Sequence, residues 1–93
     1  MENKKRARVI ISGRVQGVFF RMETKRYADR LGIKGWVKNR RDGAVEAVIE
    51  GDENRIREMI NWCKKGPPMS RVDDVQIFAE DYSGAFTSFD IAY

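Results

Sequence analysis

Residues 13–21 read Gly13-Arg14-Val15-Gln16-Gly17-Val18-Phe19-Phe20-Arg21 and join the first apolar run of the chain to its first helical pattern. Glycines at both turns let successive backbone N–H groups converge without clashes from Cβ atoms. The helix that follows would direct its positive end at the same point, and Arg21 adds a forked, permanently charged donor. This layout favours a cradle for an anion of phosphate size.

A simpler interpretation of the same stretch is a structural turn. Glycines between a strand and a helix mostly serve turns, and an arginine at the start of a helix is usually only solvated. The stretch also lacks the Gly-Lys-Ser/Thr ending of a Walker loop and the third glycine of the dinucleotide fingerprint. Spacing alone leaves both interpretations open.

Hydrophobic patterning around this stretch predicts two helices among five strands. Residues 7–12 are rich in β-branched side chains, and residues 20–31 repeat apolar positions at helical spacing before Gly32. Asp52 is expected to cap a second helix that ends at Gly66. The remaining expected strands are residues 35–40, 44–50, 72–79 and 86–91.

The pair Asp42-Gly43 predicts a hairpin turn, because glycine readily takes the positive φ that such turns need. In the strand that follows, Val45, Ala47 and Ile49 alternate with Glu46, Val48 and Glu50. One face of this strand is therefore expected to be buried and the other mostly wet. Gly51 is expected to end the strand in a turn.

This order of elements is the split βαβ pattern, so we expect an α+β fold of the ferredoxin-like βαββαβ type. An extra strand follows at the C-terminal edge. The sheet is expected to be mostly antiparallel, with both helices on one face. Residues 1–93 show no repeat or linker and are expected to form a single domain.

Composition removes several classes of chemistry. The chain has one cysteine and no histidine, which excludes an internal disulfide, the usual zinc ligand sets and any nucleophile paired with an imidazole. Cys63 lies on the apolar stripe of the second helix and is expected to pack in the core. The net charge of +4 suits an anionic ligand, although spread charge is most often only a solvated surface.

The sequence also bears on location and partners. No apolar run approaches the roughly 18 to 20 residues of a membrane span. The basic amino end leads straight into a strand, without the apolar core of a signal peptide. We therefore expect a cytoplasmic monomer that binds neither membrane nor nucleic acid.

Asn39 is the second candidate for chemistry. In the expected topology the first and third strands are central and the second lies beside the third, so Asn39 would approach the loop after the first strand. Its amide both donates and accepts hydrogen bonds and is suited to placing a water, although the residue could equally just begin the turn.

Backbone donors, a guanidinium and an amide would bind a phosphoryl group and orient water, but they offer no strong base. Phosphoryl transfer has a loose transition state, in which positioning and charge stabilisation supply most of the catalysis. An acyl phosphate suits such a site, because its leaving carboxylate is stable and needs little protonation.

Two long stretches in register, residues 13–21 and 35–45, look like the signature motifs of the acylphosphatases. Gly51, residues 66–72 and residues 82–84 with Phe86 and Phe89 resemble later and weaker segments of that family. The resemblance covers nearly the whole chain at the family's usual length. Ala85 departs from it, because an acidic residue often stands there.

The resemblance implies hydrolysis of acyl phosphates to a carboxylate and inorganic phosphate, with no metal or organic cofactor. It implies that the loop from Val15 to Phe20 binds the phosphate through backbone amides, that Arg21 holds it, and that Asn39 orients the attacking water.

Two alternatives are kept. Similar domains open larger proteins that handle carbamoyl phosphate, and the same order of elements occurs in RNA-binding modules. Those modules stack bases on aromatic residues of the two central strands. Residues 7–12 and 44–50 contain no aromatic residue.

Overall fold

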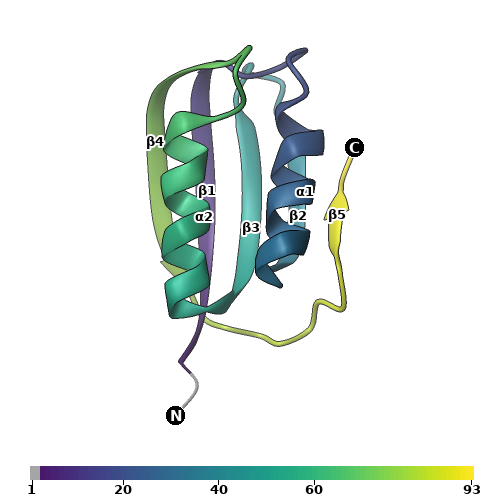
Figure 1. The fold of residues 1–93 in the computed structure, drawn as a ribbon, viewed down its shortest axis with the longest axis vertical. Coiled ribbons are helices and arrows are strands. Elements are labelled where there is room, and N and C mark those ends of the chain that lie inside the picture. Colours follow the sequence, from purple (N-terminus) through teal and green to yellow (C-terminus); the bar gives the residue numbers. More distant parts are fainter. Residues whose placement is uncertain (1–2) are drawn as a thin grey trace.

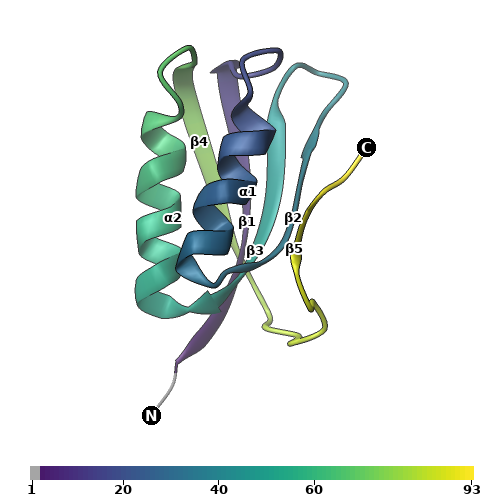
Figure 2. The ribbon, with the colours of Figure 1, turned by 45° about the vertical axis from the view of Figure 1, so that its right-hand side comes forward.

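The computed structural model describes residues 3–93 and contains one five-stranded sheet with the order β4-β1-β3-β2-β5. The elements along the chain are β1 (Lys4–Arg14), α1 (Phe20–Leu31), β2 (Lys34–Asn39), β3 (Val45–Asp52), α2 (Glu53–Lys65), β4 (Arg71–Glu80) and β5 (Phe89–Ile91). All neighbouring strands are antiparallel except β2 and β5, which are parallel. Both helices cover the same face of the sheet (Figures 1 and 2). The expected ferredoxin-like α+β fold with an added edge strand is confirmed.

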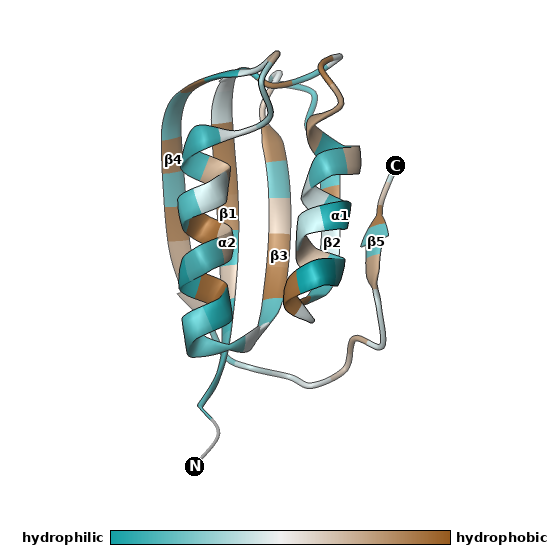
Figure 3. Ribbon diagram, viewed as in Figure 1, coloured by the Kyte–Doolittle hydropathy of each residue, from teal (hydrophilic) through white to brown (hydrophobic). Residues whose placement is uncertain are grey.

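The core lies between the helices and the sheet. Strand β1 contributes Ala7, Val9 and Ile11, while β3 contributes Val45, Ala47 and Ile49, and all of these side chains are buried. Brown segments of β1, β3 and α2 in Figure 3 mark apolar residues of these elements. The predicted helix faces point into it, with Phe20, Thr24 and Ala28 from α1 and Ile56, Met59 and Cys63 from α2.

Cys63 is fully buried among these residues. Its burial disfavours the thiolate and raises the pKa of the thiol to about 12. The interpretation of Cys63 as a core residue is confirmed. Neither helix in the described part of the chain has the length and apolar character needed to cross a bilayer.

The hairpin between β2 and β3 follows the prediction. Gly43 has a φ of 93°, and the Arg40 amide donates to the Ala44 carbonyl at 2.8 Å. Asp42 accepts a hydrogen bond from the Ala44 amide at 3.0 Å. This bond, with a smaller effect from Arg40, lowers the pKa of Asp42. The ionised carboxylate thus stabilises the turn by accepting a hydrogen bond from the Ala44 amide.

Several boundaries differ from the predictions. Strand β1 begins at Lys4, and β3 runs through Gly51 to Asp52, so Gly51 lies in a strand and not in a turn. Asp52 occupies the N-cap position of α2 without a capping hydrogen bond, and its carboxylate pairs instead with Lys4 Nζ at 2.8 Å. Strand β5 begins at Phe89 and not at residue 86. Hydrophobic alternation does not predict these boundaries, because polar residues at a strand end and the hydrogen bonds between strands leave no apolar pattern in the sequence.

The prediction that one face of β3 is mostly exposed to water is also wrong. Glu46 and Glu50 are buried, and Val48 is fully buried between them. Arg8 reaches the carboxylates of both Glu46 and Glu80, and Arg6 bonds Glu80 at 2.8 Å. The neighbouring strands therefore cover the acidic side chains with cations, a non-local pairing that the pattern within one strand does not reveal.

Glu50 is held by the connection between β4 and β5. Its carboxylate accepts hydrogen bonds from the Ser83 amide and hydroxyl, both at 2.8 Å, and from the Gly84 amide at 3.1 Å. Burial alone would raise the pKa of Glu50, but these bonds and Arg6 at 3.3 Å outweigh it and lower the pKa. Ala85, which departs from the acylphosphatase pattern, donates its amide to Ser83 Oγ at 3.2 Å. The loop contact thus survives the departure.

We expect Glu50→Gln to lower the free energy of unfolding by about 1–3 kcal/mol, because it leaves buried donors poorly matched. With its lowered folded-state pKa, the Glu50 carboxylate stabilises the fold above its unfolded-state pKa of about 4.3. That stabilisation is lost as the pH falls through the folded-state pKa. Urea unfolding of wild type and variant should therefore differ at pH 7 and converge in acid.

Glu58→Gln is the matched control, since Glu58 forms an exposed pair with Arg55 at 3.3 Å on α2. Its effect should stay within about 0.5 kcal/mol at both pH values. A loss for Glu50→Gln no larger than that of the control would show that the buried carboxylate is not an anchor of the fold.

Candidate active site

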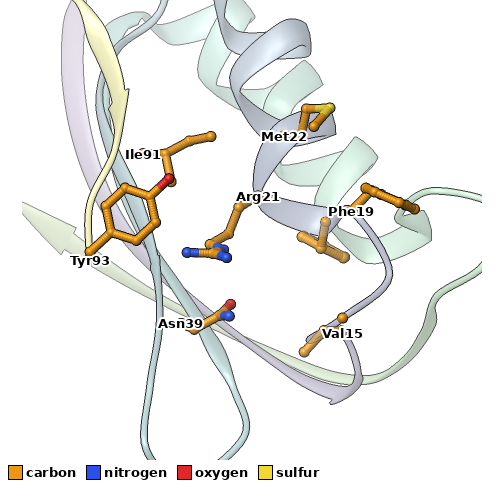
Figure 4. A pocket seen from close by; sticks show the side chains of 9 residues that line it. Val15, Phe19, Arg21, Met22, Asn39, Ile91 and Tyr93 are labelled. Carbon is orange, nitrogen blue, oxygen red and sulfur yellow. The ribbon is translucent and has the colours of Figure 1, made fainter.

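One cavity of about 290 Å³ opens at the end of the sheet where β1 leaves for α1 (Figure 4). The loop after β1, the first turn of α1, the end of β2 and the C-terminal segment all contribute to its wall. The lining residues are Val15, Gly17, Phe19, Phe20, Arg21, Met22, Asn39, Ile91 and Tyr93. Four of the six residues predicted from 15–20, together with Arg21 and Asn39, therefore line the cavity.

Val15, Gly17, Phe19 and Phe20 line the cavity, whereas Gln16 and Val18 do not. Val18 is buried in the hydrophobic core. Gln16 turns the other way, and its Nε2 donates to the carbonyls of Arg40 at 2.7 Å and Ala44 at 2.9 Å. The Gln16 side chain thereby ties the loop to the β2–β3 turn.

Left-handed backbone shapes the loop. Gly17 has a φ of 74°, and Phe19, the N-cap of α1, has a φ of 63° and a ψ of 21°. Such a conformation costs a bulky residue roughly 1–2 kcal/mol. Among residues 3–93, no backbone N–H of residues 16–22 donates a hydrogen bond to another protein group. A run of free donors before a helix is an anion-binding arrangement.

Arg21 stands in the first turn of α1. Within the described residues it forms no ion pair with a carboxylate. Its guanidinium lies over the ring of Tyr93, 5.3 Å from the ring centroid. The cation is thus available to a ligand at the edge of the free backbone donors.

Asn39 is the last residue of β2 and lines the same cavity as Arg21. Figure 4 shows its carboxamide beside the Arg21 guanidinium, so the expected approach of Asn39 to the loop is confirmed. Its Oδ1 is buried and has no hydrogen-bond partner among the described residues. A buried oxygen in this state is costly unless a ligand or water meets it.

Sequence reasoning missed Met22, Ile91 and Tyr93 as cavity residues. Strand β5 runs parallel to β2 with Val37 opposite Ile91, and the Ala92 amide donates to the Val37 carbonyl at 2.8 Å. Continuing this register by two residues brings Tyr93 beside Asn39. A parallel strand of three residues leaves no pattern in the sequence that identifies its partner strand. Met22, in contrast, directly follows Arg21 at the start of the predicted helix.

The family model described as Acylphosphatase matches residues 7–91. The chain belongs to the acylphosphatase family. It is therefore a hydrolase of small-molecule acyl phosphates, as the resemblance of the motifs implied.

Named relatives of the family agree with this assignment. An acylphosphatase of Syntrophobacter fumaroxidans is 53% identical over 91 residues, which are 98% of this chain and 94% of the relative. The crystal structure of acylphosphatase from Bacillus subtilis superposes with a TM-score of 0.92 and 39% identity, covering 96% of this chain and 99% of that one. Sequence and fold similarity thus extend over the full length of both relatives.

The same fold occurs inside a larger protein. The crystal structure of full-length HypF in its phosphate- and nucleotide-bound form matches with a TM-score of 0.87 and 25% identity. The match covers 100% of this chain but 12% of that one. The fold of this chain therefore also forms one part of a much longer protein.

We expect Gln16→Ala to lower the free energy of unfolding by about 1–3 kcal/mol, because two hydrogen bonds to backbone carbonyls are lost. It should also weaken the binding of inorganic phosphate, since the loop would no longer be held in shape. Urea unfolding and titration calorimetry with phosphate measure the two effects.

Gln76→Ala provides the control, because Gln76 is exposed on β4 and outside the cavity. It should change neither quantity. Unaltered phosphate affinity in Gln16→Ala would mean that the loop keeps its shape without the tie to the turn.

Proposed function

We propose that the cavity hydrolyses acyl phosphates by direct attack of water at phosphorus. The observation that carries this mechanism is that three kinds of group without partners among residues 3–93 lie at one cavity: the backbone N–H groups of the loop before α1, the Arg21 guanidinium, which has no carboxylate partner, and the buried Asn39 Oδ1. The first two suit a phosphate dianion and the third suits a water.

The phosphoryl group would sit among the loop amides with Arg21 across two of its oxygens. The loop from Val15 to Phe20 supplies the amides, including that of Gln16, whose side chain ties the loop to the β2–β3 turn, and that of Val18, whose side chain packs in the core. Donors held in place before the reaction stabilise developing charge without reorganisation. Arg21 is therefore assigned to holding the phosphate, because its forked guanidinium can donate to two oxygens at once.

The attacking water would donate a hydrogen bond to Asn39 Oδ1. As the bond from the water oxygen to phosphorus forms, the bond from phosphorus to the acyl oxygen breaks, and its electron pair leaves with the carboxylate. The proton of the water passes to a phosphate oxygen. A carboxylate leaving group needs no general acid, so an amide that cannot take a proton is sufficient at this position.

We further propose that the reaction needs no metal or organic cofactor, since backbone donors and Arg21 supply the positive charge. Residues 3–93 contain no group of three or more His, Cys, Asp or Glu side chains placed to hold a metal. We place the enzyme in the cytoplasm, as one domain over residues 1–93 acting as a monomer.

RNA binding is the less favoured alternative. Strands β1 and β3 carry no aromatic residue, and Arg6 and Arg8 on the face away from the helices are already paired with the carboxylates of that face. A carbamoyl-phosphate domain would turn over carbamoyl phosphate faster than acyl phosphates with larger acyl groups. The match to an acylphosphatase at 53% identity covers 94% of that relative, whereas the match to HypF covers 12% of that larger chain, which favours free acyl phosphates as substrates over a role within a larger protein.

The purified chain should release phosphate from acetyl phosphate in excess chelator, because no step of the mechanism uses a metal. In water enriched in heavy oxygen, mass spectrometry should find the label in phosphate, since water attacks phosphorus. Label confined to acetate would show attack at carbon, and loss of turnover in chelator would show that a metal is required.

Substitutions should separate the two assigned roles. Arg21→Gln is expected to weaken phosphate binding and to lower turnover on the order of 100- to 1,000-fold, the usual loss for one preorganised donor. Asn39→Ala is expected to lower kcat while the inhibition constant for inorganic phosphate stays close to that of wild type. Steady-state kinetics with phosphate as a competitive inhibitor measures both.

Exposed counterparts on α2 serve as controls. Arg57→Gln removes a cation paired with Glu53 at 3.1 Å, and Asn61→Ala removes an exposed amide, both outside the cavity. Neither should alter kcat or phosphate inhibition. Near-normal phosphate inhibition in Arg21→Gln, or a pure binding defect in Asn39→Ala, would contradict the assigned roles.

A further inference from the structure

A second cavity, of about 500 Å³, lies at the end of β2 and the turn into β3. Asn39 and Tyr93 line this cavity and also the phosphate cavity, so the two cavities are neighbours. A ligand that extends from one cavity into the other must therefore pass Asn39. None of the proposed catalytic roles uses the second cavity.

Three cations line the second cavity: Lys38, Arg40 and Arg41. Lys38 and Arg41 form no ion pair within residues 3–93. The Lys38 ammonium lies over the Trp36 ring, 5.4 Å from the ring centroid. Two cations at this cavity thus have no carboxylate partner in the described part of the chain.

The cavity also contains two carboxylates, Asp42 and Glu46, but each already has a cation of its own. Asp42 pairs with Arg40 at 3.0 Å and accepts the Ala44 amide at 3.0 Å. Glu46 pairs with Arg8 on the neighbouring strand β1, while Arg40 lies 4.0 Å from its other oxygen. The charge left over in the cavity is therefore positive, and it suits an anion.

The positions of the unpaired cations indicate the class of anion. Arg21 lines only the phosphate cavity, whereas Lys38 and Arg41 line only the second cavity. An anion that contacts all three cations must extend past Asn39 and carry negative charge along its length. A linear oligophosphate has these properties, because each phosphoryl unit brings charged oxygen acceptors.

We propose that the two cavities together form one extended site for linear oligophosphates, such as tripolyphosphate, which bind as inhibitors. The inference rests on the proposed function, because it places a terminal phosphoryl group in the phosphate cavity. The following phosphoryl groups pass Asn39 and reach Lys38 and Arg41, whose ammonium and forked guanidinium bind their oxygens. Lys38 and Arg41 add affinity for the inhibitor and take no part in bond making or breaking.

This orientation prevents hydrolysis of the oligophosphate. The attacking and leaving oxygens of phosphoryl transfer lie roughly in line through phosphorus, on opposite sides. The first bridging oxygen of the inhibitor points toward Asn39, which is the side assigned to the attacking water. Water therefore cannot approach opposite the bridging oxygen from Asn39, and the bound oligophosphate blocks the site.

The test measures dissociation constants for inorganic phosphate and for tripolyphosphate by titration calorimetry in excess chelator. Wild type should bind tripolyphosphate at least about tenfold more tightly than phosphate, because two further cations contribute. Lys38→Gln and Arg41→Gln should each lower this preference about two- to fivefold, the range for exposed ion pairs, and leave phosphate affinity close to that of wild type. A wild-type preference near one would overturn the extended site.

Lys64→Gln is the matched control, since Lys64 is exposed at the end of α2, lines neither cavity and has no ion pair among the described residues. It removes the same charge as Lys38→Gln, so it separates local contacts from an effect of net charge. Its preference should equal that of wild type. An equal loss in Lys64→Gln, or an unchanged preference in the double variant Lys38→Gln/Arg41→Gln, would overturn the proposal.

Kinetics test the orientation of the inhibitor. Tripolyphosphate should inhibit hydrolysis of acetyl phosphate competitively, because its terminal phosphoryl group occupies the phosphate cavity, and it should release no phosphate itself. Non-competitive inhibition or release of phosphate from tripolyphosphate would overturn the proposed orientation.

Failure of the proposed function has a different signature. Wild-type protein that does not hydrolyse acetyl phosphate but keeps the calorimetric preference, lowered in Lys38→Gln and Arg41→Gln, would overturn the function and leave the oligophosphate site in place. Hydrolysis of acetyl phosphate without any preference for tripolyphosphate would overturn only the extended site.

Discussion

The site depends on backbone N–H groups that the fold leaves without partners. Residues 16–22 follow the end of β1, whose pairing with β4 shifts register between Ser12 and Gly13 and continues to Arg14. A Cβ at Gly13 would collide with the Arg71 carbonyl, so the close approach needs glycine. The free donors, the positive end of α1 and Arg21 then surround one cavity, where the proposed phosphate would satisfy them.

The buried carboxylate of Glu50 is held at the other end of the molecule. The connection from β4 to β5 crosses beneath the sheet in Figure 1, far from the loop, and its Ser83 and Gly84 hold the buried Glu50. Arg6 and Glu80 extend this network across the central strands. The fold thus pairs its buried carboxylates with cations and backbone donors, and it leaves unsatisfied groups around the cavity, where a ligand can complete them.

Local signals predicted most of the architecture. Helical spacing, the glycine at position 32 and the pair Asp42-Gly43 act within a few residues, and the order of elements then implied that Asn39 would reach the loop. Burial of Glu46 depends on Arg8, 38 residues away, and no pattern within β3 contains that information. Tyr93 enters the cavity through parallel pairing of a strand of three residues, which is too short to show a register in sequence.

The two layers of the fold also bring the proposed roles together. Asn39 belongs to the sheet layer, at the end of β2, whereas Arg21 belongs to the start of α1 in the helix layer. A phosphate held between the layers would therefore meet the cation and the backbone donors before α1 from one layer and the Asn39 amide from the other. The proposed displacement needs its phosphate and its water held by separate groups, and here that separation follows from the packing of one helix on the sheet.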